Sequence, residues 1–142
     1  MEVDSIPGFS DLLPGAFGQA YNEAAFRYFL AVDRSRAARS RRVVILVLAS
    51  VRAPEGHRAK LSQDTAAALF TGLAASVREV DFVGWFYKGR VAGAVLSQGD
   101  GSTYDRVAIS NRILATLRTS LPAGRAKHVQ VRVIRFGGRT ER

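Results

Sequence analysis

The chain has 142 residues, the size of a single domain with one hydrophobic core. Hydrophobic residues make up 47% and charged residues 23%, a globular composition that excludes a wholly disordered chain. Cysteine is absent, which excludes disulfides, cysteine nucleophiles and thiolate metal sites, and the formal net charge of +9 favours an anionic partner.

The basic residues are strongly biased towards arginine, with 18 Arg among the 21 Lys and Arg. Guanidinium groups form paired contacts with phosphates and carboxylates and stack on flat rings. A GC-rich coding sequence would produce the same bias, so the arginine content alone identifies no partner.

Nothing in the sequence indicates a membrane or a secretory route. The longest unbroken apolar run, Val43 to Ala49, is far shorter than the roughly 20 residues of a membrane span. No charged segment followed by an apolar one opens the chain, so no secretory signal is expected. We therefore expect a cytoplasmic protein without a membrane span.

The N-terminal part is predicted to be an arm followed by a helix. Residues 1–14 read as a flexible arm, because prolines and glycines interrupt any period. Residues 15–42 predict a helix that starts near Phe17, carries apolar and aromatic residues at helical spacing as far as Val32, and has a basic end. This stripe predicts a homodimer or a protein partner; the alternative is that the helix packs on its own sheet. The basic end, read alone, is a solvated helix terminus that suits the helix dipole; it contains Arg34, Arg36, Arg39, Arg41 and Arg42.

The middle of the chain predicts a strand, a helix and a hairpin. The apolar run that begins at Val43 reads as a buried central strand. Ser62 is a plausible N-cap of a helix that ends near Val80. Residues 82–87 and 91–96 predict two strands joined by a turn at Lys88-Gly89. Regular alternation would place Trp85 and Tyr87 on one face of this hairpin and Phe86 on the other.

A further helix and strand complete the predicted fold. Ser102-Thr-Tyr-Asp105 fits a capping box for a helix that Pro122 ends, and residues 129–133 alternate like a half-exposed strand. The order is helix and then β-α-β-β-α-β, which predicts an α+β, ferredoxin-like domain over residues 43–136. Its antiparallel four-stranded sheet is preceded by the N-terminal helix, and residues 137–142 form a polar tail.

Residues 78–96 resemble one family with this order of elements, the GGDEF domains of diguanylate cyclases. In that family a helix ends in Arg-x-x-Asp. After five further residues comes the turn of a β-hairpin, with the sequence Gly-Gly-Asp-Glu-Phe. Here Arg78-Glu-Val-Asp81 is followed by five residues and then by Tyr87-Lys-Gly-Arg-Val91 at the place of that turn. The resemblance extends over about residues 43–135 and implies the same ferredoxin-like fold.

The departures from the family pattern concern the catalytic positions. The resemblance implies acidic residues in the turn and at the end of the first strand, where they serve metal binding and catalysis. This chain has Gly89 and Arg90 in the turn, and the strand ends in Ala49-Ser50-Val51. Phosphoryl transfer depends on metal ions that neutralise phosphate charge. We therefore expect no enzymatic activity, no cofactor and no bound metal.

Arg78 and Asp81 are the one part of the family pattern that is kept. In the family this pair forms the inhibitory site for cyclic di-GMP, so the resemblance implies a non-catalytic regulatory domain in bacterial signalling that binds cyclic di-GMP or a protein. An arginine fork suits phosphate or a guanine edge, and a carboxylate accepts from guanine N–H groups. The competing interpretation is an ion pair between residues three apart at a helix end.

The alternative function is a basic nucleic-acid-binding module on the same fold. Lys88 to Val95 begins like an RNA-recognition signature, but that module needs aromatic side chains on its central strands to stack bases. The corresponding positions here are Arg90 and Ala92, which makes nucleic acid the weaker prediction. Steep weakening of binding with salt would distinguish it.

Overall fold

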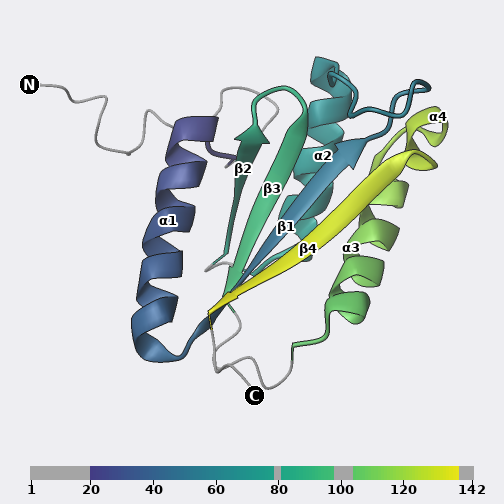
Figure 1. Ribbon diagram of the computed structural model, residues 1–142. Coiled ribbons are helices and arrows are strands. Elements are labelled where there is room, and N and C mark those ends of the chain that lie inside the picture. The colour runs from purple at the N-terminus through teal and green to yellow at the C-terminus, as the bar shows by residue number, and fades with distance from the viewer. Residues whose placement is uncertain (1–19, 79–80, 98–103, 138–142) are drawn as a thin grey trace, which may run out of the picture.

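The computed structural model describes residues 20–78, 81–97 and 104–137 (Figure 1). Helices and strands follow one another along the chain in the predicted order, with one additional short helix, α4, before the last strand. The elements are α1 (Glu23–Ser40), β1 (Val43–Val51), α2 (Gln63–Ser76), β2 (Phe82–Tyr87), β3 (Val91–Ser97), α3 (Arg106–Ser120), α4 (Ala123–Ala126) and β4 (Val129–Gly137). The predicted α+β class with a leading helix is confirmed.

The four strands form one antiparallel sheet in the order β2-β3-β1-β4. β1 is central, and all nine of its residues are buried, as expected for an apolar run covered on both faces. The hairpin turn and the end of β1 lie at one end of the sheet, which we call the turn end. The opposite end, where β1 begins and β3 and β4 finish, we call the pocket end.

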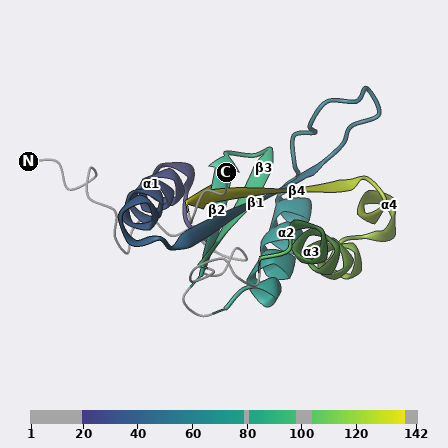
Figure 2. The ribbon, with the colours of Figure 1, turned by 60° about the horizontal axis from the view of Figure 1, so that its bottom comes forward.

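α2 and α3 lie side by side on one face of the sheet (Figure 2). They enclose the larger core, in which Phe70 of α2 packs edge-on against Trp85 of β2 at a ring-centroid distance of 4.9 Å. Fully buried Ile113 and Leu117 complete this layer from α3. Burial of side chains of this size contributes about 1.5–3 kcal/mol each and fixes the helices against the sheet.

α1 covers part of the other face and is therefore integral to the domain. Its Phe26 is completely buried in a second core with Leu30 and the β1 residues Val44 and Leu46. The helix thus packs on its own sheet, which is the alternative to dimerisation, but Tyr28 of the predicted stripe remains 51% exposed. Pairing of two copies through this helix stays a prediction. Residues 43–136 alone would leave the second core open.

The element boundaries differ from the predicted ones where capping residues decide them. α1 begins at Glu23 and not near Phe17, because the side chain of Asn22 accepts a hydrogen bond from the Ala25 N–H at 2.8 Å. Ser62 caps α2 as predicted, but this helix ends at Ser76, before Val80. Asp105 caps α3 by accepting a hydrogen bond from the Ala108 N–H. The predicted arm (1–14), Ser102 and the tail beyond Gly137 lie outside the described residues.

The hairpin departs from regular alternation at its last residues. The pairing register shifts between Trp85 and Tyr87, so Tyr87 lies beside Phe86 with ring centroids 5.1 Å apart. The prediction that Trp85 and Tyr87 share a face was therefore wrong, because a bulge adds one residue to the strand.

Among the described residues, no helix is long and apolar enough to cross a membrane.

Candidate functional site

The turn end of the sheet carries the positions where the family resemblance would place catalysis. Gly89 adopts a positive φ of 79° in the hairpin turn, and its carbonyl accepts a hydrogen bond from the Leu61 N–H at 2.7 Å. The guanidinium of Arg90 donates to the carbonyl of Arg58 at 3.0 Å. These contacts hold the turn against the loop that follows β1. Within the described ranges, no group of three or more His, Cys, Asp or Glu side chains could hold a metal ion.

Asp81 lies at the end of the link between α2 and β2, at the pocket end, and is half-buried as a whole residue. Its side chain is 0% exposed. The backbone N–H of Arg78 donates to Oδ2 at 2.9 Å, and the backbone N–H of Ser97 donates to Oδ1 at 3.1 Å. Both carboxylate oxygens are therefore engaged by the backbone, and Asp81 fastens the link to the end of β3.

Arg78 is the exposed partner of this pair. Its side chain is 63% exposed, its Nε lies 3.6 Å from Oδ2 of Asp81, and its Nη2 donates to the carbonyl oxygen of Ser97. The structure thus brings the two predicted residues together as an ion pair just beyond the helix. The Arg78 guanidinium has further N–H donors and its side chain is largely exposed, so this residue can take an anionic group while Asp81 holds it in place.

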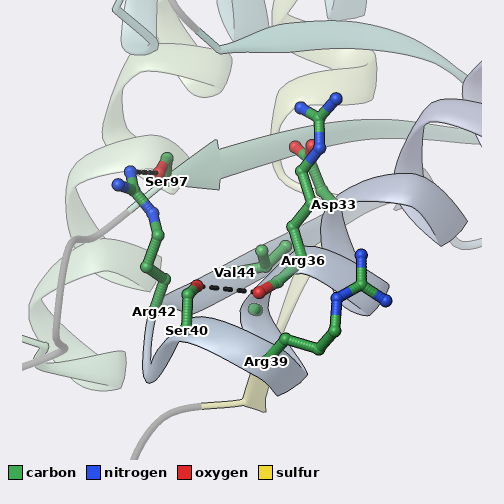
Figure 3. Close-up of a pocket in the computed structure, with 8 residues that line it drawn as sticks. Asp33, Arg36, Arg39, Ser40, Arg42, Val44 and Ser97 are labelled. Carbon is green, nitrogen blue, oxygen red and sulfur yellow. Dashed lines mark hydrogen bonds between the residues drawn. The ribbon is translucent and has the colours of Figure 1, made fainter.

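A pocket of about 610 Å³ opens beside this pair, between the end of α1 and the start of β1 (Figure 3). We call it the arginine pocket; it is lined by Asp33, Arg36, Ala37, Arg39, Ser40, Arg42, Val44 and Ser97. Nη2 of Arg42 donates to Oγ of Ser97 at 3.0 Å, so Ser97 receives one arginine on its side chain and another, Arg78, on its carbonyl.

Asp33 is the acidic residue of the arginine pocket. Its partial burial raises the pKa of the carboxyl above the ordinary value, while the neighbouring Arg36 and Arg42 act in the opposite direction and Asp81 adds to the rise. A second pocket, of about 510 Å³, shares Asp33 and Arg36 and extends to Tyr28 and Phe82. Asp33 therefore lies at the boundary between the arginine pocket and this second pocket, which is lined by aromatic residues.

The arginines of the basic helix end are exposed, as the interpretation as a solvated terminus predicts, and three of them also line the arginine pocket. Arg36, Arg39 and Arg42 line the pocket, while Arg34 stacks on the Phe136 ring at 4.0 Å and Arg39 also donates to Ser35. The density of arginines before β1 was visible in the sequence. The participation of Asp33 and Ser97 had no local signal, because it depends on α1 returning to the sheet.

Two comparisons with known proteins gave no match: no protein-family model and no curated protein matches the sequence. Solved structures do match. The GGDEF domain of FimX from Pseudomonas aeruginosa covers 94% of this chain and 85% of its own, with a TM-score of 0.61 and 14% identity. The GGDEF domain of DgcB from Caulobacter crescentus, solved in complex with c-di-GMP, covers 92% of this chain and 76% of its own, with a TM-score of 0.62 and 8% identity.

A third structure leads to the same fold. A DGC protein from Thermotoga maritima covers 85% of this chain and 83% of its own, with a TM-score of 0.57 and 13% identity. At such low identity these likenesses concern the fold. The chain is therefore a GGDEF-like domain in its fold.

Proposed function

We propose that this chain is a non-catalytic, GGDEF-like regulatory domain that binds cyclic di-GMP at the pocket end of its sheet. The observation that carries the proposal is the convergence of Arg78 and Arg42 on Ser97, beside Arg36 and Arg39 of the arginine pocket. Several guanidinium groups around one hollow suit a ligand with two phosphates.

The division of labour within the pair follows from burial. Arg78 is exposed and contacts the ligand, whereas Asp81 is buried and acts as a positioning residue for the Arg78 backbone and fork. Asp33, at the rim shared by the two pockets, supplies the carboxylate that accepts from guanine N–H groups. The DgcB structure, of similar fold, was solved with c-di-GMP, which supports this ligand class.

The absence of catalysis in the proposal rests on residue types at the turn end. The turn presents Lys88, Gly89 and Arg90, and β1 ends in buried Ala49, Ser50 and Val51. None of these side chains can ligate a divalent cation as a carboxylate does. A nucleotide triphosphate at this end would lack the metal ions that neutralise charge in phosphoryl transfer.

Titration calorimetry of the full chain tests the proposal with three ligands, cyclic di-GMP, GTP and a short RNA, at two salt concentrations. We expect cyclic di-GMP to bind and Arg78→Ala to weaken it about 10- to 150-fold, since a charge-assisted contact contributes about 1.5–3 kcal/mol. Arg118→Ala, on an exposed part of α3, removes the same charge as a control.

The outcomes separate the competing functions. No heat with cyclic di-GMP at millimolar concentration overturns the ligand assignment. RNA binding that collapses between the two salt concentrations, without any response to cyclic di-GMP, would support the basic nucleic-acid module instead. Equal weakening by Arg78→Ala and Arg118→Ala would indicate attraction to net charge and no defined site.

A further inference from the structure

β4 forms an edge of the sheet, and its outward backbone groups can be identified. The Arg52 N–H donates to the His128 carbonyl at 2.9 Å, and these two residues continue the register in which Val51 lies opposite Val129. Bonded and non-bonded pairs alternate in an antiparallel ladder. The N–H and C=O groups of Val131 and Val133 therefore face away from β1, along the free edge.

The opposite edge of the sheet is covered by the chain itself. On β2, the Val83 carbonyl accepts from the Tyr21 N–H at 2.9 Å, and the Trp85 N–H donates to the Tyr21 carbonyl at 3.0 Å. The Lys88 N–H donates to the side chain of Glu23. Within residues 20–78, 81–97 and 104–137, β4 pairs with β1 alone, so the two edges differ in their capacity to accept another strand.

A groove of about 260 Å³ runs between this free edge and α3. Its floor is apolar, formed by Val131 and Val133, and Val107 of α3, a residue that is 62% exposed, also lines it. Ser110 and Asn111 add polar groups along the helix. An extended segment beside β4 would place every second side chain into this groove, because strand side chains alternate between faces.

The charges around the edge specify the partner. Arg106 lines the groove, and Arg135 lies near the end of β4 with its guanidinium 5.5 Å from the Tyr104 ring centroid. Arg132 lies between Val131 and Val133 at the rim of the groove, and its side chain alternates to the opposite face, where it lines another pocket with Leu48 and Gln130. The neighbouring Asp105 is engaged as the N-cap of α3. Two copies of so basic an edge repel one another, whereas a segment with acidic residues is attracted.

We propose that the free edge of β4 binds an extended, acidic segment of a partner protein, which adds to the sheet as a fifth strand. Main-chain hydrogen bonds to Val131 and Val133 supply affinity. Alternation supplies specificity, because apolar side chains enter the groove while acidic ones on the other face lie beside Arg132. This surface is separate from the arginine pocket, so the proposal does not depend on ligand binding there.

A displayed library of random ten-residue peptides, screened against the full chain, tests the proposal. We expect selected peptides to alternate apolar and acidic residues. In hydrogen–deuterium exchange, a selected peptide should slow exchange at the Val131 and Val133 amides and leave the Arg132 amide, already bonded to β1, little changed. Failure to select such a pattern, or protection confined to other elements, overturns the proposal.

Two pairs of variants separate strand addition from simple charge attraction. Val131→Pro removes an outward N–H without breaking the β1 ladder, a position where an edge strand tolerates proline, and should weaken the selected peptide at least tenfold. Val131→Thr keeps the N–H and should weaken the peptide far less than Val131→Pro does.

Arg132→Glu should weaken binding by a similar factor, and Arg118→Glu, which makes the same charge change away from the groove, should not. Unchanged binding to Val131→Pro and Arg132→Glu overturns the proposal. If Val131→Pro does not fold, the exchange pattern and the Arg132→Glu result decide. A doubled mass of the free chain in solution, abolished by Val131→Pro, would instead show that a second copy occupies the edge.

Discussion

The carboxylate of Asp81 receives the backbone N–H of Ser97 at 3.1 Å, and so joins the link before β2 to the last residue of β3. The Arg78 N–H completes the arrangement on the other oxygen at 2.9 Å. The Asp81 side chain is 0% exposed, and its removal would leave both backbone donors without their acceptor.

Asp81→Ala should therefore destabilise the fold by about 1–3 kcal/mol, the cost of leaving buried donors without an acceptor. Arg78→Ala should cost much less, because the Arg78 side chain is 63% exposed and exposed ion pairs contribute about 0–1 kcal/mol. Urea denaturation of both variants measures the difference. Equal stability of the two variants would contradict the structural role of Asp81.

Gly84→Ala should destabilise the domain by about 1–3 kcal/mol through overpacking. A Cβ at Gly84 would lie 2.6 Å from the backbone carbonyl oxygen of Tyr21, which cannot rotate away, and 2.9 Å from the Phe26 ring. Gly124→Ala is the matched control, because a Cβ there meets nothing within 4 Å. Thermal unfolding compares the two variants, and a Gly84→Ala protein as stable as Gly124→Ala would show that α1 does not pack on β2 as described.

The stability of the Asp33→Asn variant should increase relative to that of the wild type as pH rises from about 4. Burial raises the pKa of the Asp33 carboxyl above its ordinary 3.8, so the folded state binds the proton more tightly than the unfolded state. Wild-type stability then falls as pH rises from 3.8 through the raised pKa, whereas asparagine has no proton to lose. Denaturant unfolding between pH 3 and pH 7 checks this; a constant difference across the range would refute it.

The purified chain should make no cyclic di-GMP from GTP with magnesium or manganese. The reason is the set of side chains at the turn end, where Ala49, Ser50, Gly89 and Arg90 stand at the positions of the family's acidic residues. Chromatography of the nucleotide products measures this. Product that forms in proportion to protein, and that disappears in a Gly89→Trp variant, would establish an active site at this turn.

Most of the fold could be predicted because its signals are local. The apolar run at Val43–Ala49 indicated the central strand, Ser62 indicated the start of α2, and the Lys88-Gly89 turn indicated the hairpin. The helix start at Glu23 was missed, because Tyr21 belongs to a bridge with Gly84 that is 63 positions away. The helical spacing of apolar residues cannot show that a residue near the helix start pairs with a distant strand and so lies outside the helix.

The candidate site was predictable only in part, for a similar reason. Arg78 and Asp81 stood out by their spacing from the hairpin, and their pairing is confirmed. That Asp81 is buried while Arg78 is exposed depends on Ser97, and the arginine pocket depends on α1 folding onto the sheet. Neither relationship has a counterpart in the local pattern of residues.

Phe26 packs against Gly84 and Gly93, and this contact has a thermodynamic consequence for the other end of α1. α1 carries Phe26 in its first turn and Arg36 and Arg39 in its last turns, so release of the helix from the sheet would also dismantle the arginine pocket. A ligand that requires the docked helix stabilises it by mass action, and a loosened helix lowers the apparent affinity by the fraction undocked. If the proposed ligand binds there, helix docking and site occupancy are linked equilibria, and a measurement of one reports on the other.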